Sequence, residues 1–382
     1  MKKIFYAGIV GIILFEILNI YFIMPMPGSQ RMNSIDVAYF LYRHRWYFRI
    51  AFGLLTAVGT TNAFQIKYKW IPALAFVLAM TVVYLFNFRL VADHMFKQPA
   101  KLTFQSKGRN LLNDSSLVVI VENNGVVKAY PIRYIVYHHQ VQDEVGGKAM
   151  IITYCSVCRT GRVYEPIVKG KLEKFRLVGM DHFNAMVEDE ATKSWWRQAN
   201  GEAITGQLKG EVLPGVESQQ LTIEKLFELY PNATVMQLDE VSKTHYDSLG
   251  KFERGKSEGE LTRTDSLSWN DKSWVVGVQV GSSSKAYDWN KLKAARIIND
   301  NVGDKPIVLA LALDNQSFVA FERSSEAETF AIREDTLFAS EKLYDFSGSN
   351  LAKTPQHLKK VNAYQEFWHS WKTFHPQTEQ FR

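Results

Sequence analysis

The sequence LVVIVENNGVVKAYP spans residues 117–131 and places an Asn-Gly pair between two runs rich in β-branched residues. An Asn-Gly pair in this setting is the strongest short signal for a β-hairpin. Residues 149–154 and 161–165 are predicted strands, and residues 133–139 are a predicted short helix. From about Pro99 onward the chain keeps this pattern of short strands and turns. The sequence therefore predicts an α+β fold whose soluble part, residues 99–382, is predominantly antiparallel β.

The same arrangement recurs at an offset of 157 residues, which predicts two related halves in the soluble part. The predicted repeat units are residues 115–170 and 272–325, and chance similarity of strand and turn patterns is the alternative. The tripeptide KAY occurs at both 128–130 and 285–287, and four further identities pair Asp143, Val145, Gly146 and Lys148 with Asp300, Val302, Gly303 and Lys305. The residues equivalent to His138, Cys155 and Cys158 are Ala295, Ala312 and Asn315, so the second unit is expected to be scaffold.

Residues 4–24 and 70–88 are apolar stretches long enough to cross a membrane. At about 1.5 Å per residue, each covers a hydrocarbon core of roughly 30 Å. No small-x-small cleavage site follows the first stretch, which argues against a cleaved signal peptide. Residues 50–66 are a weaker third candidate, because threonines and Asn62 lower their apolarity. We expect about three transmembrane helices within residues 1–98, and so a multi-pass integral membrane protein.

Glu16 lies inside the first predicted span. A carboxylate within a membrane is a functional-site hypothesis by default, and a structural Glu that faces the helix bundle is the alternative.

Positive charge is concentrated in the predicted membrane region. Residues 1–101 hold eleven Lys and Arg against three acidic residues, a net charge of +8, whereas residues 102–382 carry −2. A nearly neutral soluble part lacks the basic patch that nucleic acid requires, so we expect no nucleic-acid partner. The lysines at positions 2, 3, 67 and 69 favour one membrane orientation, and the arginines between positions 31 and 49 favour the other.

Cys155 and Cys158 are the two cysteines of the chain, and their C-x-x-C spacing lets both sulfurs reach one centre. Such a pair suits two ligands of a soft or borderline metal, or a dithiol–disulfide couple. Two reduced, buried cysteines without further chemistry are the alternative. Arg159 and Arg162 lie nearby in the chain and are expected to favour the thiolate form.

His138 and His139 precede the cysteine pair by sixteen or more residues. Either histidine could supply a third metal ligand or a general base. Hydrogen-bonded structural histidines are the alternative.

A second cluster within residues 181–210 combines short polar side chains with large aromatic ones, a composition suited to lining a pocket. The same polar groups commonly close a loop onto its own backbone, which is the alternative. The candidate pocket residues are Asp189, Thr192, Ser194 and Trp195, together with His139 from outside this stretch.

Common catalytic motifs are absent from the sequence. It contains no G-x-S-x-G, P-loop, Rossmann glycine pattern or H-E-x-x-H. No nucleotide cofactor is therefore indicated, and the sequence does not decide whether the protein is an enzyme.

Over about residues 115–235 the chain resembles a bacterial and archaeal family catalogued as domain of unknown function 3179. The resemblance follows the order and spacing of four motifs. They appear here as Ala129-Tyr130-Pro131 with His138, Val141 and Asp143; Thr153-Tyr154-Cys155 with Cys158; Asp189, Thr192, Ser194 and Trp195; and Gly201, Ala203, Gly206, Leu208 and Gly210.

The chain departs from the family pattern at four positions. It has His139 in place of Glu, Gln142 in place of Asn, Ser156 in place of Pro and Arg159 in place of Gly. The missing Glu puts a proton-transfer role at that position in doubt, whereas the retained cysteines and His138 keep a metal or redox site open. Members of the family are often exported, so the resemblance implies an extracytoplasmic soluble domain.

These observations predict a membrane-anchored protein that binds a transition metal, copper or zinc, through Cys155 and Cys158 with His138 as a further ligand. A thiol–disulfide oxidoreductase is one alternative, disfavoured because the pair joins two strands rather than opening a helix. A non-enzymatic envelope interaction domain with a structural disulfide is another. The sequence identifies no protein partner and no small-molecule substrate.

Overall fold

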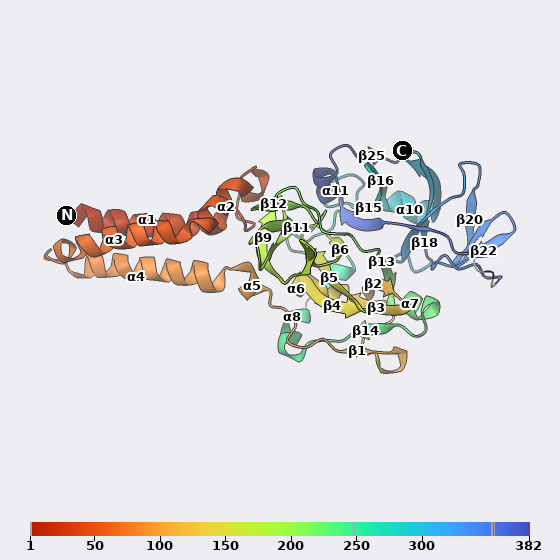
Figure 1. Ribbon diagram of the computed structural model, residues 1–382, viewed down its shortest axis with the longest axis horizontal. Helices are drawn as coiled ribbons and strands as arrows, with labels where there is room; N and C mark the ends of the chain where they lie inside the picture. The colour runs from red at the N-terminus through yellow and green to blue at the C-terminus, as the bar shows by residue number, and fades with distance from the viewer. Residues whose placement is uncertain (1, 248, 353, 355) are drawn as a thin grey trace. The chain divides into compact units, whose positions relative to one another are not determined.

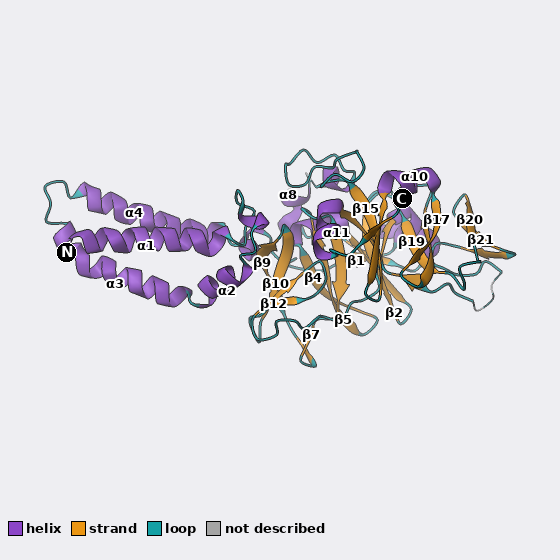
Figure 2. Ribbon diagram, turned by 90° about the horizontal axis from the view of Figure 1, so that it is seen from above, coloured by secondary structure: helices purple, strands orange, loops and turns teal. Residues whose placement is uncertain are grey.

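The computed structural model describes residues 2–247, 249–352, 354 and 356–382, which form two compact units (Figures 1 and 2). The first unit comprises residues 2–97 together with Glu173–Arg197 and Glu202–Val212. The second comprises Gln98–Leu172, Gln198–Gly201 and Leu213–Arg382. Each unit is thus assembled from segments that are distant in the sequence.

The long helices of the first unit pack against α1, which contacts both α3 and α4 (Figure 2). A Cβ atom at Gly59 of α3 would lie 2.3 Å from the backbone nitrogen of Phe5 in α1, so the close approach of these helices requires glycine. The helical elements of this unit are α1 (Lys2–Tyr21), η1 (Ser29–Arg31), α2 (Ile35–Arg43), α3 (Arg45–Ala63), α4 (Trp70–Tyr84), η2 (Leu85–Arg89) and α5 (Ala92–Met95).

Within the described residues, two helices rather than three are long and apolar enough to cross a membrane, Lys2–Tyr21 and Trp70–Arg89. The third predicted span, residues 50–66, falls largely on α3, which is not one of these two helices, so the number of candidate spans is two rather than the three predicted. The helix itself forms, but it begins five residues earlier than expected and includes Arg45 and Arg49. These charges and its threonines leave α3 less apolar than α1 and α4.

Glu16 is 1% exposed and faces the other helices of this unit. Arg49 donates Nε and Nη2 to the two carboxylate oxygens of Glu16, at 2.7 and 2.9 Å. Asn87 donates Nδ2 to the same carboxylate at 2.9 Å. A buried carboxylate with a bidentate arginine and an amide is stably satisfied, so these contacts match the structural alternative for Glu16.

The strands of the first unit form an antiparallel sheet with the order β12-β11-β10-β9. Trp195 and Met186 on this sheet pack in one core with Ile20 of α1 and Ile23. Gly179 allows this packing, because a Cβ there would lie 2.2 Å from the carbonyl oxygen of Ile23. The strands are β9 (Phe175–Asp181), β10 (Asn184–Asp189), β11 (Trp195–Arg197) and β12 (Ala203–Thr205).

The second unit begins with the predicted hairpin, which is confirmed. Asn124 and Gly125 both have positive φ angles, 49° and 75°, as a type I′ turn requires. The predicted short helix and the strands on either side of the cysteine pair are also confirmed. These elements are β2 (Leu117–Asn123), β3 (Val126–Pro131), α6 (Ile132–His138), β4 (Gln140–Val145), β5 (Lys148–Cys155) and β6 (Thr160–Tyr164).

The later part of the second unit has elements in the same order as β2 to β6. They are β15 (Trp274–Val280), β16 (Ser283–Asp288), α10 (Trp289–Ala295), β17 (Ile297–Val302), β18 (Lys305–Leu311) and β19 (Phe318–Glu322). A later strand–helix–strand segment adds one strand to each edge of each hairpin, β2–β3 and β15–β16. The first return is β13 (Gln219–Thr222), α7 (Ile223–Leu229) and β14 (Thr234–Met236), and the second is β24 (Ala363–Phe367), α11 (Trp368–Phe374) and β25 (Glu379–Gln380).

Antiparallel sheets dominate the second unit, so the predicted α+β class is confirmed. The sheet orders are β1-β14-β3-β2-β13, β4-β5-β6, β24-β15-β16-β25, β17-β18-β19-β23, β20-β21-β22 and β7-β8. The remaining elements are β1 (Phe104–Gln105), η3 (Lys107–Arg109), β7 (Ile167–Val168), β8 (Lys171–Leu172), η4 (Glu240–Ser242), α8 (Lys243–Tyr246), α9 (Gly250–Glu253), β20 (Phe330–Arg333), β21 (Thr336–Ala339), β22 (Lys342–Tyr344) and β23 (Lys360–Val361).

Candidate functional site

The two cysteines lie in the turn between β5 and β6 of the second unit. Cys155 ends β5 and pairs with Thr160, the first residue of β6. Arg159 completes the reversal with a φ angle of +55°, in the left-handed region. Both cysteines are thiols with 0% exposure. The turn therefore holds two sulfurs in the interior of the unit rather than on its surface.

The C-x-x-C turn is covered by residues more than 100 positions later in the chain. The backbone nitrogen of Phe367 in β24 donates to the carbonyl oxygen of Cys158 at 2.9 Å. The hydroxyls of Thr160 and of Ser370 in α11 lie 3.3 Å apart. Sequence reasoning missed this cover, because no spacing rule connects residues so far apart.

Lys272 places a cation beside the turn. Its Nζ donates to the carbonyl oxygen of Val157, between the two cysteines, at 2.8 Å, and lies 3.3 Å from Nε2 of His369. Burial lowers the pKa of Lys272, and the charges of Cys158 and Cys155 oppose that shift. Burial also lowers the pKa of His369 to about 4, so this histidine is neutral at pH 7. The fold thus brings an ionisable lysine close to the thiols.

Burial raises the pKa of the Cys158 thiol well above its ordinary value, and the neighbouring Cys155 raises it further. A hydrogen bond with Ser370 acts in the opposite direction but does not prevail. The expectation that nearby arginines favour the thiolate is wrong for Cys158, because loss of solvation disfavours the charged form of a fully buried group. In the absence of a ligand the thiol is the stable form.

The two arginines are directed to other partners. Arg159 donates to the carbonyl oxygens of Phe252 and Glu253, at 3.1 and 3.0 Å, and its guanidinium lies 3.8 Å from the ring centre of Trp274. Arg162 pairs with the buried carboxylate of Glu366. Both are therefore used for packing and charge pairing within the second unit.

His138 ends α6, and its Nε2 lies 2.5 Å from the hydroxyl oxygen of Tyr246. His139 follows with a φ angle of +61°, and its Nδ1 lies 2.9 Å from the carbonyl oxygen of Val136. Burial lowers the pKa of His139 to about 4. In the described part of the chain, no group of three or more His, Cys, Asp or Glu side chains could hold a metal ion. A metal site that includes His138 stays a prediction.

The second predicted cluster belongs to the first unit. Asp189 accepts hydrogen bonds at Oδ1 from the backbone nitrogen of Thr192, at 2.5 Å, and at Oδ2 from the Thr192 hydroxyl, the Ser194 backbone nitrogen and Nε1 of Trp196, at 2.8, 3.1 and 2.9 Å. Nε1 of Trp195 donates to Glu188 at 3.0 Å. These contacts close the turn between β10 and β11 onto its own backbone, as the structural alternative for these residues expects.

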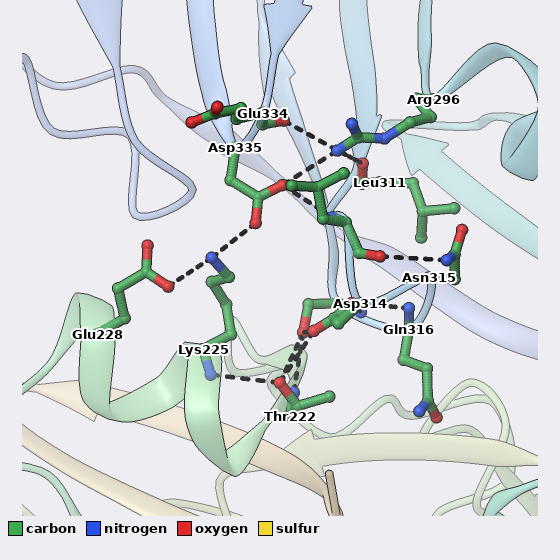
Figure 3. Close-up of polar contacts among 12 residues, drawn as sticks. Thr222, Lys225, Glu228, Arg296, Leu311, Asp314, Asn315, Gln316, Glu334 and Asp335 are labelled. Carbon is green, nitrogen blue, oxygen red and sulfur yellow. Dashed lines mark hydrogen bonds and ion pairs between the residues drawn. The ribbon is translucent and has the colours of Figure 1, made fainter. Parts of the chain in front are cut away.

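The turn between β18 and β19 lies 157 residues after the C-x-x-C turn and is closed by polar contacts instead of thiols (Figure 3). The Thr222 hydroxyl, at the start of α7, donates to Asp314 in this turn at 2.9 Å. Lys225 of α7 pairs with Asp335 at 2.7 Å, and Asp335 also pairs with Arg296 at 3.0 Å (Figure 3). Ion pairs and hydrogen bonds therefore hold the turn between β18 and β19.

A protein family described as "Protein of unknown function (DUF3179)" matches residues 97–378, more than half of the chain. No curated protein and no solved structure matches the chain.

Proposed function

The chain belongs to the DUF3179 family of proteins of unknown function, and from this premise we propose that it is a membrane-anchored protein that binds Cu(I) through Cys155 and Cys158. The observation that carries the proposal is the pairing of two fully buried thiols in one turn beside the partly buried amine of Lys272. Soft thiolate ligands select soft metal ions, of which Cu(I) is one.

The number of available ligands favours Cu(I) over zinc. Structural zinc sites take four protein ligands and catalytic sites take three. The described residues offer no group of three or more His, Cys, Asp and Glu ligands. Two thiolates satisfy a monovalent soft ion, so the C-x-x-C turn fits Cu(I) without a contribution from His138.

The charge at the site also fits a monovalent ion. Two thiolates with one Cu(I) ion carry one net negative charge, and Lys272 supplies one positive charge beside the turn. Metal ligands must be deprotonated, so binding releases the protons of both thiols. Lys272 stabilises the charge that remains, and burial of the site excludes water from it.

The raised pKa of Cys158 argues against a thiol–disulfide oxidoreductase. Such enzymes attack with a thiolate whose pKa is lowered and which is accessible to the substrate disulfide. Here both sulfurs are fully buried. A structural disulfide between Cys155 and Cys158, and two reduced cysteines without further chemistry, are the remaining alternatives. The experiment below separates both from metal binding.

We also propose that the second unit consists of two duplicated halves. The two hairpins, their helices and the following strands have the same order and nearly the same lengths. Each half also has the same tyrosine contact, with Tyr130 donating to Asp143 at 2.7 Å and Tyr287 donating to Asp300 at 3.0 Å. Strands β14 and β25 add in parallel to β3 and β16, respectively.

The halves cover one another in a reciprocal way. Helix α7 of the first half provides Thr222 and Lys225 contacts to the β18–β19 turn region of the second. Helix α11 of the second half covers the C-x-x-C turn of the first through Ser370. Duplication of one ancestral unit explains both arrangements. Because only the first half has the cysteine pair, we assign metal binding to the first half and a scaffold role to the second.

We propose that α1 and the helix formed by α4 and η2 both cross the membrane, and that the second unit is extracytoplasmic. The length and apolarity of these two helices support the spans. The resemblance of the chain to a family whose members are often exported supports the placement. A C-terminal reporter that is active on one side of the membrane tests it, and cytoplasmic activity would contradict it.

Metal content of the full-length protein tests the main proposal. The protein is purified in detergent, reduced, exposed to Cu(I) or Zn²⁺ without oxygen, and desalted before mass spectrometry. We expect about one equivalent of copper in the parent protein and in Ser156→Ala, a matched change in the same turn, and none in Cys155→Ser/Cys158→Ser. Retention of zinc in place of copper, or of neither metal, would overturn the proposal. A disulfide that resists reduction in the parent would then support the structural alternative.

A further inference from the structure

The first unit contains a cavity of about 370 Å³ where the helices meet the β9–β10 sheet. Its walls come from α1, α2, α3, η2 and the sheet. The residues that line the cavity belong to the first unit, whereas the cysteine pair belongs to the second. Four cationic side chains line it, Arg45, Arg49, Arg176 and Lys193, against two acidic ones, Asp93 and Glu188.

Two of these cations are already neutralised by the protein. Arg176 pairs with Glu188 at 2.9 Å and with Asp93 at 3.2 Å. Arg49 pairs with Glu16. Arg45 and Lys193 form no ion pair among the described residues, so the cavity has an excess of positive charge that an anion can neutralise.

The cavity also has unused hydrogen-bond acceptors. Asn19 is 7% exposed, and its Oδ1 has no hydrogen-bond partner in the described part of the chain. Oδ1 of Asp93 is likewise buried without a partner. A buried acceptor without a donor costs free energy, so these two oxygens favour a ligand that brings hydrogen-bond donors of its own.

The position of the cavity suits an amphiphilic ligand. Asn19 and Ile20 belong to the last turn of α1, and Phe86 belongs to η2 at the end of the other apolar helix. If these two helices cross the membrane, as proposed above, both spans end at the cavity. Ile20, Ile23 and Phe86 give one wall an apolar surface.

We propose that this cavity binds an anionic phosphate group that carries hydroxyl donors, supplied by the head group of a membrane phospholipid such as phosphatidylglycerol. Arg45 and Lys193 neutralise the phosphate, and the hydroxyls donate to Asn19 and Asp93. The apolar wall takes the part of the lipid next to the head group. The lipid source rests on the membrane anchoring proposed above, whereas the phosphate chemistry does not.

Native mass spectrometry of the full-length protein in detergent tests the proposal with phosphatidylglycerol, phosphatidylcholine and inorganic phosphate as probes. We expect preferential retention of one phosphatidylglycerol. Arg45→Gln/Lys193→Gln should weaken retention by up to about a hundredfold, since each lost charge-assisted hydrogen bond is worth about a factor of ten. The matched control Lys174→Gln/Lys209→Gln removes two exposed cations of the same unit outside the cavity and should leave retention unchanged.

Asn19→Leu gives a second readout that does not depend on the charge changes. It should raise the melting temperature measured without lipid, because it removes a buried acceptor that lacks a donor, and it should weaken phosphatidylglycerol retention. A lower melting temperature with unchanged retention would mean that Asn19 serves the helix packing, and would overturn its assignment to the cavity.

Equal retention of both lipids, or a double variant that behaves as the parent, overturns the proposal. Displacement of the lipid by millimolar inorganic phosphate supports the phosphate site and assigns it a soluble source. Cys155→Ser/Cys158→Ser should retain the lipid as the parent does, so a failure of copper binding is separable from a failure here. Release of the protein from membranes by alkaline carbonate would contradict the anchoring, and the phosphate probe would still test the cavity.

Discussion

Lys272 brings a positive charge close to the two cysteines. Its Nζ is held in the C-x-x-C turn by the carbonyl oxygen of Val157, and the charges of Cys158 and Cys155 act on its pKa. The interaction is mutual: the free energy by which the ammonium stabilises a thiolate equals the free energy by which the thiolate stabilises the ammonium. Lys272 therefore limits the rise of the Cys158 pKa that burial causes.

We predict that Lys272→Met raises the pKa of Cys158 further and weakens Cu(I) binding about tenfold. Ultraviolet absorbance of the thiolate against pH, in a Cys155→Ser background, measures the pKa of the single remaining thiol. Lys251→Met, an exposed position in α9, is the control. An unchanged titration in Lys272→Met would show that the lysine serves packing alone.

Glu253 is a second buried residue with a displaced titration. Burial raises the pKa of its carboxyl group to about 7, although the backbone nitrogen of Arg133 and the charges of Arg133, Arg159 and Arg254 act to lower it. The folded protein therefore binds a proton at Glu253 between about pH 4.5 and 7, where the unfolded chain does not. Stability must fall as the pH rises through this range, and the cost is complete above pH 7.

We predict that Glu253→Gln stabilises the protein at pH 8 by up to about 3 kcal/mol and has little effect near pH 4.5. Glutamine keeps an oxygen that accepts from the backbone nitrogen of Arg133 but does not titrate. Unfolding midpoints measured from pH 5 to pH 8 test this, with the exposed Glu258→Gln as a control. A gain that does not depend on pH would contradict the titration as its cause.

At the scale of the elements, α6 and α10 begin in different ways although each follows a hairpin. Asp288 caps α10 by accepting from the backbone nitrogens of Asn290 and Lys291, at 2.9 and 3.3 Å. Pro131 occupies the corresponding position before α6 and has no acceptor in its side chain. The Glu253 carboxylate takes that role and accepts from the backbone nitrogen of Arg133 at 3.0 Å.

We predict that Asp288→Ala lowers the free energy of unfolding by about 1 kcal/mol, the usual cost of a lost N-cap. Asp288→Asn keeps a capping oxygen and should restore most of that loss. Chemical denaturation of the two variants and the parent provides the comparison. If Asn is as damaging as Ala, the carboxylate charge rather than the cap stabilises α10.

At the scale of the molecule, the second unit depends on contacts between its earlier and later segments. Arg162 of β6 pairs with Glu366 of β24, and their side chains are 6% and 1% exposed. Arg162 contacts Oε1 of Glu366, and Oε2 has no hydrogen-bond partner in the described residues. Removal of the arginine would leave a buried charge without compensation, which is among the most costly single changes in a protein.

We predict that Arg162→Met destabilises the protein by about 3–5 kcal/mol, and that Arg162→Met/Glu366→Leu loses less than the sum of the two single changes. Lys359→Met breaks the exposed pair of Lys359 with Glu322 and should cost less than about 1 kcal/mol. Denaturant midpoints of the four proteins of the cycle measure the coupling. Additive losses would mean that the two residues act independently.

Local patterns in the sequence were sufficient to predict individual strands, turns and helices. The Asn-Gly turn specified the β2–β3 hairpin, the strands around the cysteine pair followed from their β-branched runs, and the family was recognisable from short motifs. The sequence predicted three candidate spans and the structure has two, because α3 includes Arg45 and Arg49 and is less apolar than α1 and α4. Its close packing on α1 through Gly59 involves a partner that the sequence of α3 does not contain.

The surroundings of the cysteines were decided by the tertiary structure. Spacing identified Cys155 and Cys158, but the residues that cover them, Lys272 and Ser370, come from the later part of the chain. Arg159 and Arg162 are close in sequence and yet turn to other partners. Turns, helices and motifs depend on neighbours in the chain, so the sequence determined them. The burial and pKa of the cysteines, and the partners of the nearby arginines, depend on which distant segments come into contact. Only the tertiary structure determines those contacts.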